Sequence, residues 1–221
     1  MASPVAFDLN GAPVEVPADG SLLDALRETL GIRSVKDGCS PQGQCGCCTV
    51  WVDGQPRVAC VTPVGRVRGR AVTTVEGLPD AGKWAAAFCE RGASQCGFCT
   101  PGIIMRAAAL SEERRGDPDR VRQAMLAHLC RCTGWQPVVE AVTAVSVGGG
   151  DLDSTDRDLE AAGRRAELEG GVPQLVSDDV ALGLGGFADD AAPADALVAV
   201  RSVTGGWAVG HTLHELSLIH I

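Results

Sequence analysis

The sequence predicts an α+β protein in which a β-rich N-terminal part with one helix is followed by an all-helical part. Two observations carry this prediction. Short apolar stretches separated by turn signals fill the first third of the chain, whereas the next third contains repeated signals for helix starts. The hydrophobic content of 45% is enough for packed cores, and with only 4% aromatic residues these cores are expected to be mainly aliphatic.

The N-terminal part begins with a predicted hairpin of residues 5–9 and 13–16. An Asn-Gly pair lies between these strands, and this pair is preferred in type I′ turns. A helix is then expected to start at Ser21, which can cap it, and to end at Gly31.

A second hairpin is predicted from residues 49–52 and 57–61 around an Asp-Gly turn, and a last strand from residues 72–75. Strands wrapped on one helix are typical of a plant-type ferredoxin β-grasp. We therefore expect a first domain with this fold at residues 3–77.

The second part of the chain is predicted to be helical because capping or polar residues followed by Pro recur along it. The expected helices cover residues 83–91, 100–110, 117–129 and 136–147, and Thr100 is expected to be the N-cap of the second one. They predict an all-α four-helix domain at residues 82–147.

Four cysteines of the first domain have a spacing that indicates an iron–sulfur ligand set. Cys39, Cys45 and Cys48 lie in one loop, and Cys60 follows after eleven intervening residues. This spacing is close to the plant-type pattern C-x4-C-x2-C with a distant fourth Cys, although the first gap here holds five residues. Three glycines in the loop let the backbone bend around a large inorganic group.

A second quartet lies in the helical part, with Cys96 and Cys99 in a C-x2-C pair and Cys130 and Cys132 in a C-x-C pair. Both pairs flank predicted helix ends, where N-terminal amides would stabilise an anionic cluster. The spacing alone could hold zinc nearly as well as iron.

Disulfide bonds and zinc ligation are the two competing roles for the ten cysteines. A disulfide framework is typical of secreted proteins, but the N-terminus has no apolar signal segment, which indicates a reducing cytoplasm. Zinc sites usually consist of two CxxC-like pairs, and the first quartet does not pair in this way. Cys47 and Cys89 are interpreted as small packed residues.

The flanks of the cysteines carry a resemblance to a known family. The stretches are DGC at residues 37–39, CGCCTV at 45–50, QCGFCTPG at 95–102 and LCRCTG at 129–134. The sequence resembles the iron–sulfur subunit or domain of the molybdenum hydroxylases, the group of xanthine dehydrogenase, aldehyde oxidase and carbon monoxide dehydrogenase.

The resemblance implies two [2Fe-2S] clusters in series, one on each quartet. It also implies that the second cluster lies nearest a molybdenum-pterin cofactor, which Gln95 and Cys132 approach. The electrons would leave to FAD or another acceptor. The expected partners are a molybdenum-binding catalytic domain, fused or separate, and an FAD-binding subunit, so that a hetero-oligomer is expected.

This part of such an oxidoreductase would relay electrons and would turn over no substrate alone, because it has no catalytic residues of its own. One alternative is a free-standing ferredoxin-like electron carrier. Another is a zinc-binding interaction module. The residues that would decide the substrate are expected to lie in the catalytic region.

The remainder of the chain differs in charge. Up to residue 150 the chain has fifteen acidic and fifteen basic residues, and after it thirteen acidic and four basic, so the net charge of −9 comes from the last part. This acidity argues against a nucleic-acid partner, and no apolar stretch indicates a membrane segment. Residues 148–164 are predicted to form a flexible linker.

Residues 165–215 are interpreted as a truncated start of the molybdenum-pterin domain. The last six residues, 216–221, read LSLIHI. This string is the translation of the adapter used in transposase-based sequencing libraries, so we interpret it as adapter-derived and expect the natural chain to continue after Glu215.

Overall fold

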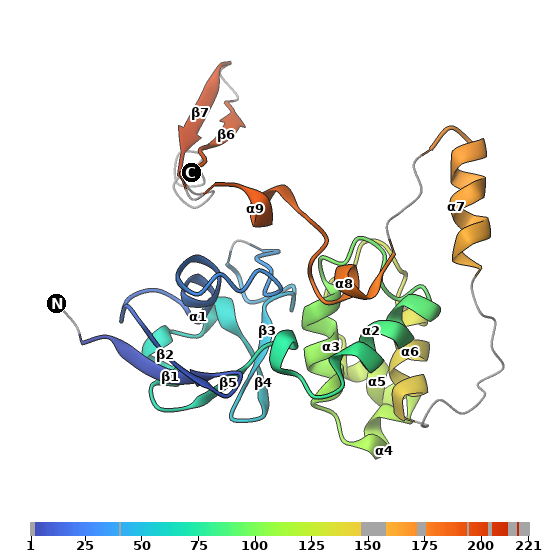
Figure 1. Cartoon of the computed structure of the whole chain (residues 1–221), viewed down its shortest axis with the longest axis horizontal. Coiled ribbons are helices and arrows are strands. Elements are labelled where there is room, and N and C mark those ends of the chain that lie inside the picture. Colours follow the sequence, from blue (N-terminus) through green and yellow to red (C-terminus); the bar gives the residue numbers. More distant parts are fainter. Residues whose placement is uncertain are drawn as a thin grey trace. The chain divides into compact units, whose positions relative to one another are not determined.

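The computed structural model describes residues 3–39, 41–146, 158–171, 176–193, 195–202, 205–211 and 216. The chain forms two compact units, residues 1–185 and residues 186–221, and each is described by itself. In the first unit a β-sheet with a covering helix is followed along the chain by a group of helices (Figure 1).

The N-terminal half of the first unit is built on a five-stranded sheet with the order β2-β1-β5-β3-β4. Strands β1 (Val5–Leu9) and β2 (Ala12–Val16) form the first predicted hairpin. Asn10 and Gly11 in its turn have φ angles of 55° and 86°, so both adopt the left-handed conformation that a type I′ turn requires.

The second predicted hairpin consists of β3 (Thr49–Val52) and β4 (Gln55–Val58). Strand β5 (Ala71–Thr73) lies between the two hairpins, parallel to β1 and antiparallel to β3. Strand β4 ends earlier than expected, because the chain turns at Ala59 into the short 3-10 helix η2 (Ala59–Val61).

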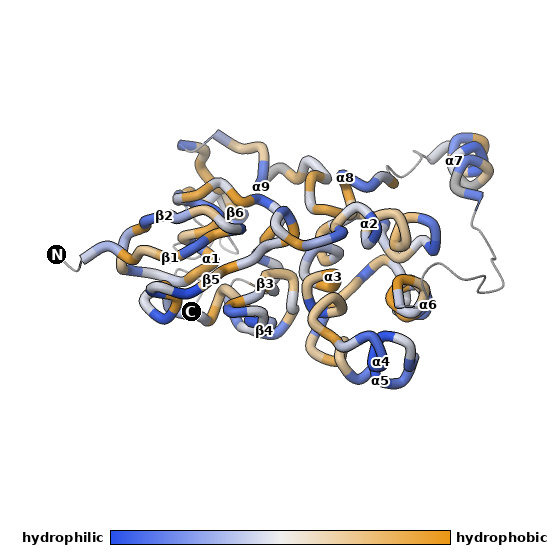
Figure 2. The backbone as a smooth tube through the Cα atoms, turned by 60° about the horizontal axis from the view of Figure 1, so that its bottom comes forward, coloured by the Kyte–Doolittle hydropathy of each residue, from blue (hydrophilic) through white to orange (hydrophobic). Residues whose placement is uncertain are grey.

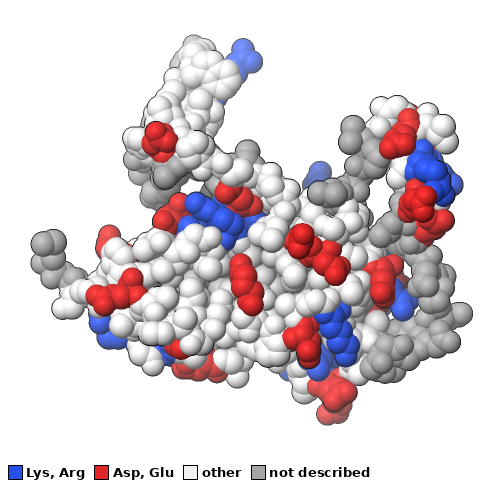
Figure 3. All heavy atoms as spheres, viewed as in Figure 1, with Lys and Arg blue, Asp and Glu red and all other residues white. Residues whose placement is uncertain are grey.

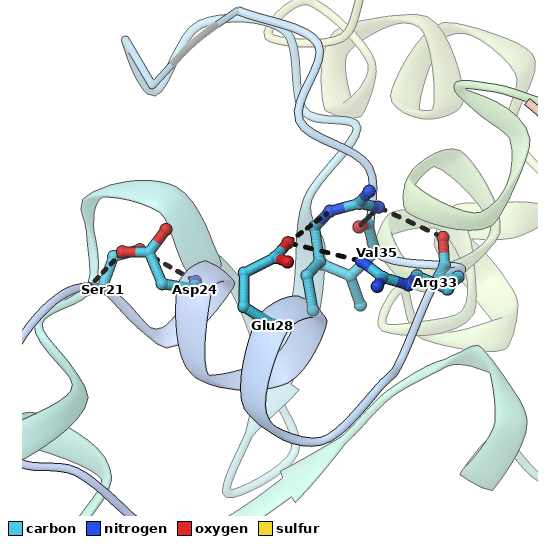
Figure 4. A network of polar contacts seen from close by, with 6 residues as sticks. Ser21, Asp24, Glu28, Arg33 and Val35 are labelled. Carbon is cyan, nitrogen blue, oxygen red and sulfur yellow. Dashed lines mark hydrogen bonds and ion pairs between the residues drawn. The ribbon is translucent and has the colours of Figure 1, made fainter. Parts of the chain in front are cut away.

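One face of the sheet is covered by the continuous helical segment α1 (Leu22–Asp24) and η1 (Ala25–Thr29), which buries Leu22 and Leu26. Ser21 and Asp24 cap its start reciprocally, as expected. Figure 4 shows these caps and the ion pair of Glu28 with Arg33. The buried Arg27 of this segment donates to the carbonyl of Val35 at 2.9 Å and so fixes the chain before the first cysteine loop.

The helical half contains five helices, of which the short α4 was not predicted. They are α2 (Ala81–Glu90), α3 (Thr100–Ala108), α4 (Glu112–Arg115), α5 (Pro118–Ala124) and α6 (Gln136–Ser146). Helix α3 is buried along most of its length, whereas α4 and α5 are more hydrophilic (Figure 2). Short 3-10 helices η3 (Val64–Val67) and η4 (Val75–Gly77) precede α2 in the chain.

Two expected helix boundaries are wrong. Thr100 was expected to cap α3, but the N-cap is Cys99. Helix α5 was expected to run to residue 129, but it ends at Ala124. It ends there because the amide of Leu129 bonds to the carbonyl of Cys45 in the other half, so the residues before Cys130 leave the helix.

The two halves of the first unit have adjoining hydrophobic cores. One core lies under the sheet and the other among α2, α3 and α6. The indole Nε1 of Trp51 on β3 donates to the carbonyl of Met105 on α3 at 2.7 Å, which ties the halves together. Acidic and basic side chains are interspersed on the face of this unit seen in Figure 3.

Beyond the helical half, α7 (Leu159–Leu168) begins inside the stretch expected to be a linker and runs across its expected end at residue 164. The carboxylate of Asp158 caps it by accepting from the amide of Ala161. Helix α8 (Asp178–Ala181) then returns to the helical half and packs on α2. Residues 147–157, most of the expected linker, lie outside the described residues.

The second unit contains α9 (Ala188–Ala191) and an antiparallel hairpin of β6 (Val198–Arg201) and β7 (Trp207–Gly210). The expected adapter-derived tail falls outside the described residues except for Leu216. Among the described residues, no helix combines the length and apolar character needed to cross a lipid bilayer.

Candidate functional site

The first quartet gathers around one loop of the N-terminal half. Cys39, Cys45 and Cys48 lie between η1 and β3, and Cys60 reaches them from η2. The side chain of Cys45 contacts that of Cys39, while the amide of Cys60 approaches the Sγ of Cys48 at 3.5 Å. The four thiols therefore form two contacting pairs.

Backbone amides of the same loop point at these sulfur atoms. The amide of Gln42 donates to the Sγ of Cys39 at 3.3 Å, and the amides of Gly38 and Gly43 are directed at Cys45 and Cys60. Amide donors stabilise thiolates, so the loop is prepared for negatively charged sulfur.

There is little room for a side chain at position 38 of this loop. A Cβ atom added to Gly38 would lie 3.0 Å from the Sγ of Cys45 and 3.1 Å from that of Cys47. Any side chain at this position would press on the sulfur atoms that face the loop interior.

The pKa values in the first quartet diverge. A hydrogen bond from the Cys47 side chain is the largest effect that lowers the pKa of Cys45 to about 5, and the amides of Cys47 and Gly38 act in the same direction. Burial raises the pKa values of Cys48 and Cys60. Without metal, this loop therefore holds one ready thiolate and buried neutral thiols, which must lose their protons when metal binds.

The second quartet lies at the loops around α3, α5 and α6. Cys96 and Cys99 precede α3, and Cys130 and Cys132 lie between α5 and α6. Here too the thiols form pairs: the Sγ atoms of Cys96 and Cys132 are 3.6 Å apart, and the side chain of Cys99 contacts that of Cys130.

Cys130 is the favoured thiolate of this second set. Its contact with the Cys99 thiol is the largest effect that lowers its pKa to about 5, and the hydroxyl and amide of Thr133, at 3.1 and 3.5 Å, contribute as well. Because Cys99 is the N-cap of α3, the positive end of that nine-residue helix also faces the quartet.

Gln95 and Cys132, the two residues expected at a pterin, lie together on the surface. The side-chain amide of Gln95 donates to the carbonyl oxygen of Cys132 at 3.3 Å. The Cys132 side chain is exposed, unlike Cys45, Cys48, Cys60 and Cys99, which are buried.

The two quartets are joined through protein contacts. The amide of Leu129, next to Cys130, donates to the carbonyl of Cys45 at 3.0 Å. A Cβ atom added to Gly102 at the start of α3 would lie 2.4 Å from the carbonyl of Gly46. The loop of the first quartet is thus in direct contact with the helix that starts at the second.

His128 fills the remaining space between the quartets. Its ring lies against Gly46, and its Nε2 is 3.4 Å from the hydroxyl of Thr49, while its Nδ1 has no hydrogen-bond partner among the described residues. Burial lowers the pKa of His128 to about 4, so the ring is neutral at physiological pH. Its role in the described structure is to pack.

The residues present fit a two-iron cluster, because each quartet brings four cysteine side chains together. Two irons take two pairs of thiolates, and each quartet supplies two pairs. The all-sulfur donor sets and their amide donors are what a [2Fe-2S] cluster needs.

Comparisons with known proteins agree with this geometry. Two family models match, described as "2Fe-2S iron-sulfur cluster binding domain" over residues 2–77 and "[2Fe-2S] binding domain" over residues 74–143. The nicotinate dehydrogenase small FeS subunit of Eubacterium barkeri is 40% identical over 62% of this chain and 91% of its own length. The chain belongs to the iron–sulfur subunit family of the molybdenum hydroxylases.

Other members of the family differ in how much of them this chain spans. The xanthine dehydrogenase iron-sulfur-binding subunit of Escherichia coli O157:H7 is 39% identical over 61% of this chain and 88% of its own length. The aldehyde oxidoreductase of Desulfovibrio desulfuricans superimposes with a TM-score of 0.73 at 32% identity over 90% of this chain, but over only 23% of its own chain. Members of this family are [2Fe-2S] electron-transfer parts of oxidoreductases, and so is this chain.

Sequence reasoning predicted both quartets but missed three residues that lie close to them in the chain. Leu129 acts through its backbone amide, which no side-chain pattern reveals. His128 and Lys36 are buried polar residues whose spacing carries no motif. Their nearness to Cys130 and Cys39 in the chain was the available signal.

Proposed function

We propose that this chain passes electrons, one at a time, from a molybdenum-pterin site to FAD or another acceptor. The ligands would be Cys96, Cys99, Cys130 and Cys132 for the cluster on the molybdenum side and Cys39, Cys45, Cys48 and Cys60 for the second relay. Each [2Fe-2S] cluster, when bound, accepts and returns one electron. The observation that supports the proposal is the 3.0 Å hydrogen bond from the amide of Leu129, next to Cys130, to the carbonyl of Cys45, because it joins the loops of the two cysteine quartets.

The order of the relays is supported by the exposure of the second quartet. Cys132 is exposed and Gln95 is bonded to its carbonyl, so both can face a pterin held by a partner surface. In this proposal their role is to position the cofactor edge against a ligand of the cluster. Three of the four thiols of the first quartet are buried, and backbone amides donate to its sulfur atoms.

The domain plan also remains a proposal. We assign a ferredoxin β-grasp to residues 3–77 and to residues 82–147 a [2Fe-2S] domain of the four expected helices with the short α4 added. A linker that includes the start of α7 is assigned to residues 148–164, and the start of a molybdenum-pterin domain to residues 165–215. The aldehyde oxidoreductase likeness supports a fused catalytic domain, because it extends over 90% of this chain whereas the match to the small FeS subunit covers 62%. An FAD-binding subunit would complete a hetero-oligomer in the cytoplasm, where thiols stay reduced.

The substrate is set elsewhere in such an enzyme. The relatives are named for nicotinate, xanthine and aldehydes, although their iron–sulfur parts are similar to this one at 32–40% identity. We therefore propose no substrate from the residues of this chain, and we assign none of them to catalysis on substrate.

The test is metal content and spectroscopy on the full chain purified without oxygen. The proposal predicts four irons and four labile sulfides per chain, and two distinct rhombic electron paramagnetic resonance signals after reduction. Stoichiometric zinc without visible absorption would overturn it in favour of a zinc-binding interaction module. A free-standing electron carrier would show both clusters but no association with a molybdenum-binding or FAD-binding partner.

A further inference from the structure

The segment of residues 177–183, which contains α8, is part of the first unit and packs on its helical half, although it lies beyond both matched family models. We name it the α8 segment. Val180 and Ala181 are buried, and the helix packs on α2. A four-residue helix is not stable by itself, so these contacts must hold it in place.

The first contact is with the ligand loop of the second quartet. Gly97 lies between Cys96 and Cys99 and has a φ of +78°. A Cβ atom added to Gly97 would lie 2.3 Å from the carbonyl oxygen of Val180. The backbone of the α8 segment therefore rests directly on this loop, at a distance that only glycine allows.

The second contact is with the chain that leads into the first cysteine loop. Gly183 has a φ of +100°, and a Cβ atom added to it would lie 2.7 Å from the Cα of Ser34. Next to it, the Nζ of Lys36 donates to the carbonyl of Gly183 at 2.9 Å. The Lys36 side chain is only 1% exposed, and a buried ammonium group is stable only when it is hydrogen-bonded.

A third contact involves Cys89 on α2. The carboxylate of Asp178 lies against the Cys89 thiol, and burial followed by this negative charge raises the pKa of Cys89 to about 11. The α8 segment thus touches α2 and the loop of residues 96–99, which belong to the helical half. It also touches residues 34–36, which belong to the sheet half.

We infer that the α8 segment is an intramolecular strap whose docking site is formed by Ser34, Lys36 and Gly97. It fastens the sheet half to the helical half and covers the ligand loop of the second quartet on one side. The docking rests on these protein contacts alone. Its effect on the second cluster rests on the proposed function, because solvent exposure is one of the factors that set a cluster potential.

The strap connects the second cluster to the part of the chain that follows the cluster domains. A movement of the C-terminal part that pulled the α8 segment away would expose the loop of residues 96–99 to water. The second cluster would then respond to the position of a segment that supplies none of its ligands.

The test compares two substitutions on the strap in the full chain. Gly183→Ala introduces a Cβ atom against Ser34 at a φ of +100°, whereas Gly186→Ala also has a positive φ, of +69°, but nothing within 4 Å. Hydrogen exchange of the Ala181 and Leu182 amides should become at least about tenfold faster in Gly183→Ala, the size expected from losing one charge-assisted hydrogen bond. In Gly186→Ala it should change less than about twofold.

A second pair acts from the docking site. Gly97→Ala should release the same amides because of the Val180 carbonyl, and Gly134→Ala, with a φ of +72° and open space, should not. Unchanged exchange in both Gly183→Ala and Gly97→Ala would overturn the strap. If the Ala181 and Leu182 amides exchanged faster in Gly183→Ala while the reduction potential of the second cluster stayed unchanged, the role of the strap as a cover of that cluster would be overturned. Absence of clusters would count against the proposed function, while the exchange result would still decide the docking.

Discussion

The amide of Leu129 donates a hydrogen bond to the carbonyl oxygen of Cys45 across 3.0 Å. Cys45 is a proposed ligand of the first cluster, and Leu129 directly precedes Cys130, a proposed ligand of the second. The contact therefore joins the ligand loops of the two proposed clusters. The side chain of Leu129 is largely exposed, and the backbone alone makes the connection.

Replacing Leu129 with Pro removes the amide donor and leaves the Cys45 carbonyl with only the weak 3.7 Å contact from the Cys47 thiol. We expect a loss of about 1–3 kcal/mol in unfolding free energy, seen as a fall of several degrees in the temperature at which visible cluster absorption disappears. Leu129→Ala keeps the amide and should stay within about 0.5 kcal/mol of the natural chain. Equal melting temperatures of the two variants would show that the hydrogen bond does not stabilise the unit.

Gly46 is expected to be intolerant of a side chain because His128 lies against it. A Cβ atom at position 46 would lie 2.5 Å from the His128 ring, whereas Gly54, with a similar φ of +72°, has nothing within 4 Å. Gly46→Ala should therefore destabilise the protein by about 1–3 kcal/mol more than Gly54→Ala. The extra cost should shrink in a His128→Ala background, and an unchanged cost there would contradict the contact.

Cys89 is expected to react slowly with alkylating agents. Burial and then Asp178 raise its pKa from 9.0 to about 11, so at pH 8 about a hundredfold less thiolate is present than for an unshifted thiol. Iodoacetamide labelling followed by mass spectrometry should show a rate that still rises between pH 9 and pH 10. Asp178→Asn should lower the pKa and speed the labelling; a rate that levels off near pH 9 in the natural chain would contradict the assignment.

The two cysteines outside the quartets should not be required for cluster assembly. Cys47→Ala and Cys89→Ala should each retain both paramagnetic signals, because other residues complete each set of two thiol pairs. Cys47→Ala is the stricter test of this prediction, because the Cys47 thiol is hydrogen-bonded to the proposed ligand Cys45. Loss of the first signal in Cys47→Ala, with protein still folded by circular dichroism, would make it a ligand.

Much of the fold follows from local chemistry in the sequence. The Asn10–Gly11 turn, the Ser21 cap and the helix beginning at Pro118 were predictable because short-range sterics and hydrogen bonds decide them. The early end of α5 was not predictable in this way. It depends on the Cys45 carbonyl, more than eighty residues away in the chain, which takes the amide of Leu129 out of the helix.

The candidate site, like the fold, could be predicted only in part from the sequence. Cysteine spacing and flanks indicated both quartets, since ligation restricts residue type and position. The docking of the α8 segment was not foreseen, because it depends on a missing Cβ atom at Gly97 and on a buried Lys36, and neither forms a sequence pattern. The same residues would give the same sequence pattern if they lay in a solvent-exposed loop.

The central claim is that the two quartets hold separate clusters, and serine substitution of one ligand in each tests it most directly. In Cys45→Ser the first of the two paramagnetic signals should disappear and the second remain, and Cys99→Ser should show the reverse, with two irons lost in each case. If either substitution removed both signals from folded protein, or neither substitution removed a signal, the assignment of ligands to two separate clusters would be contradicted.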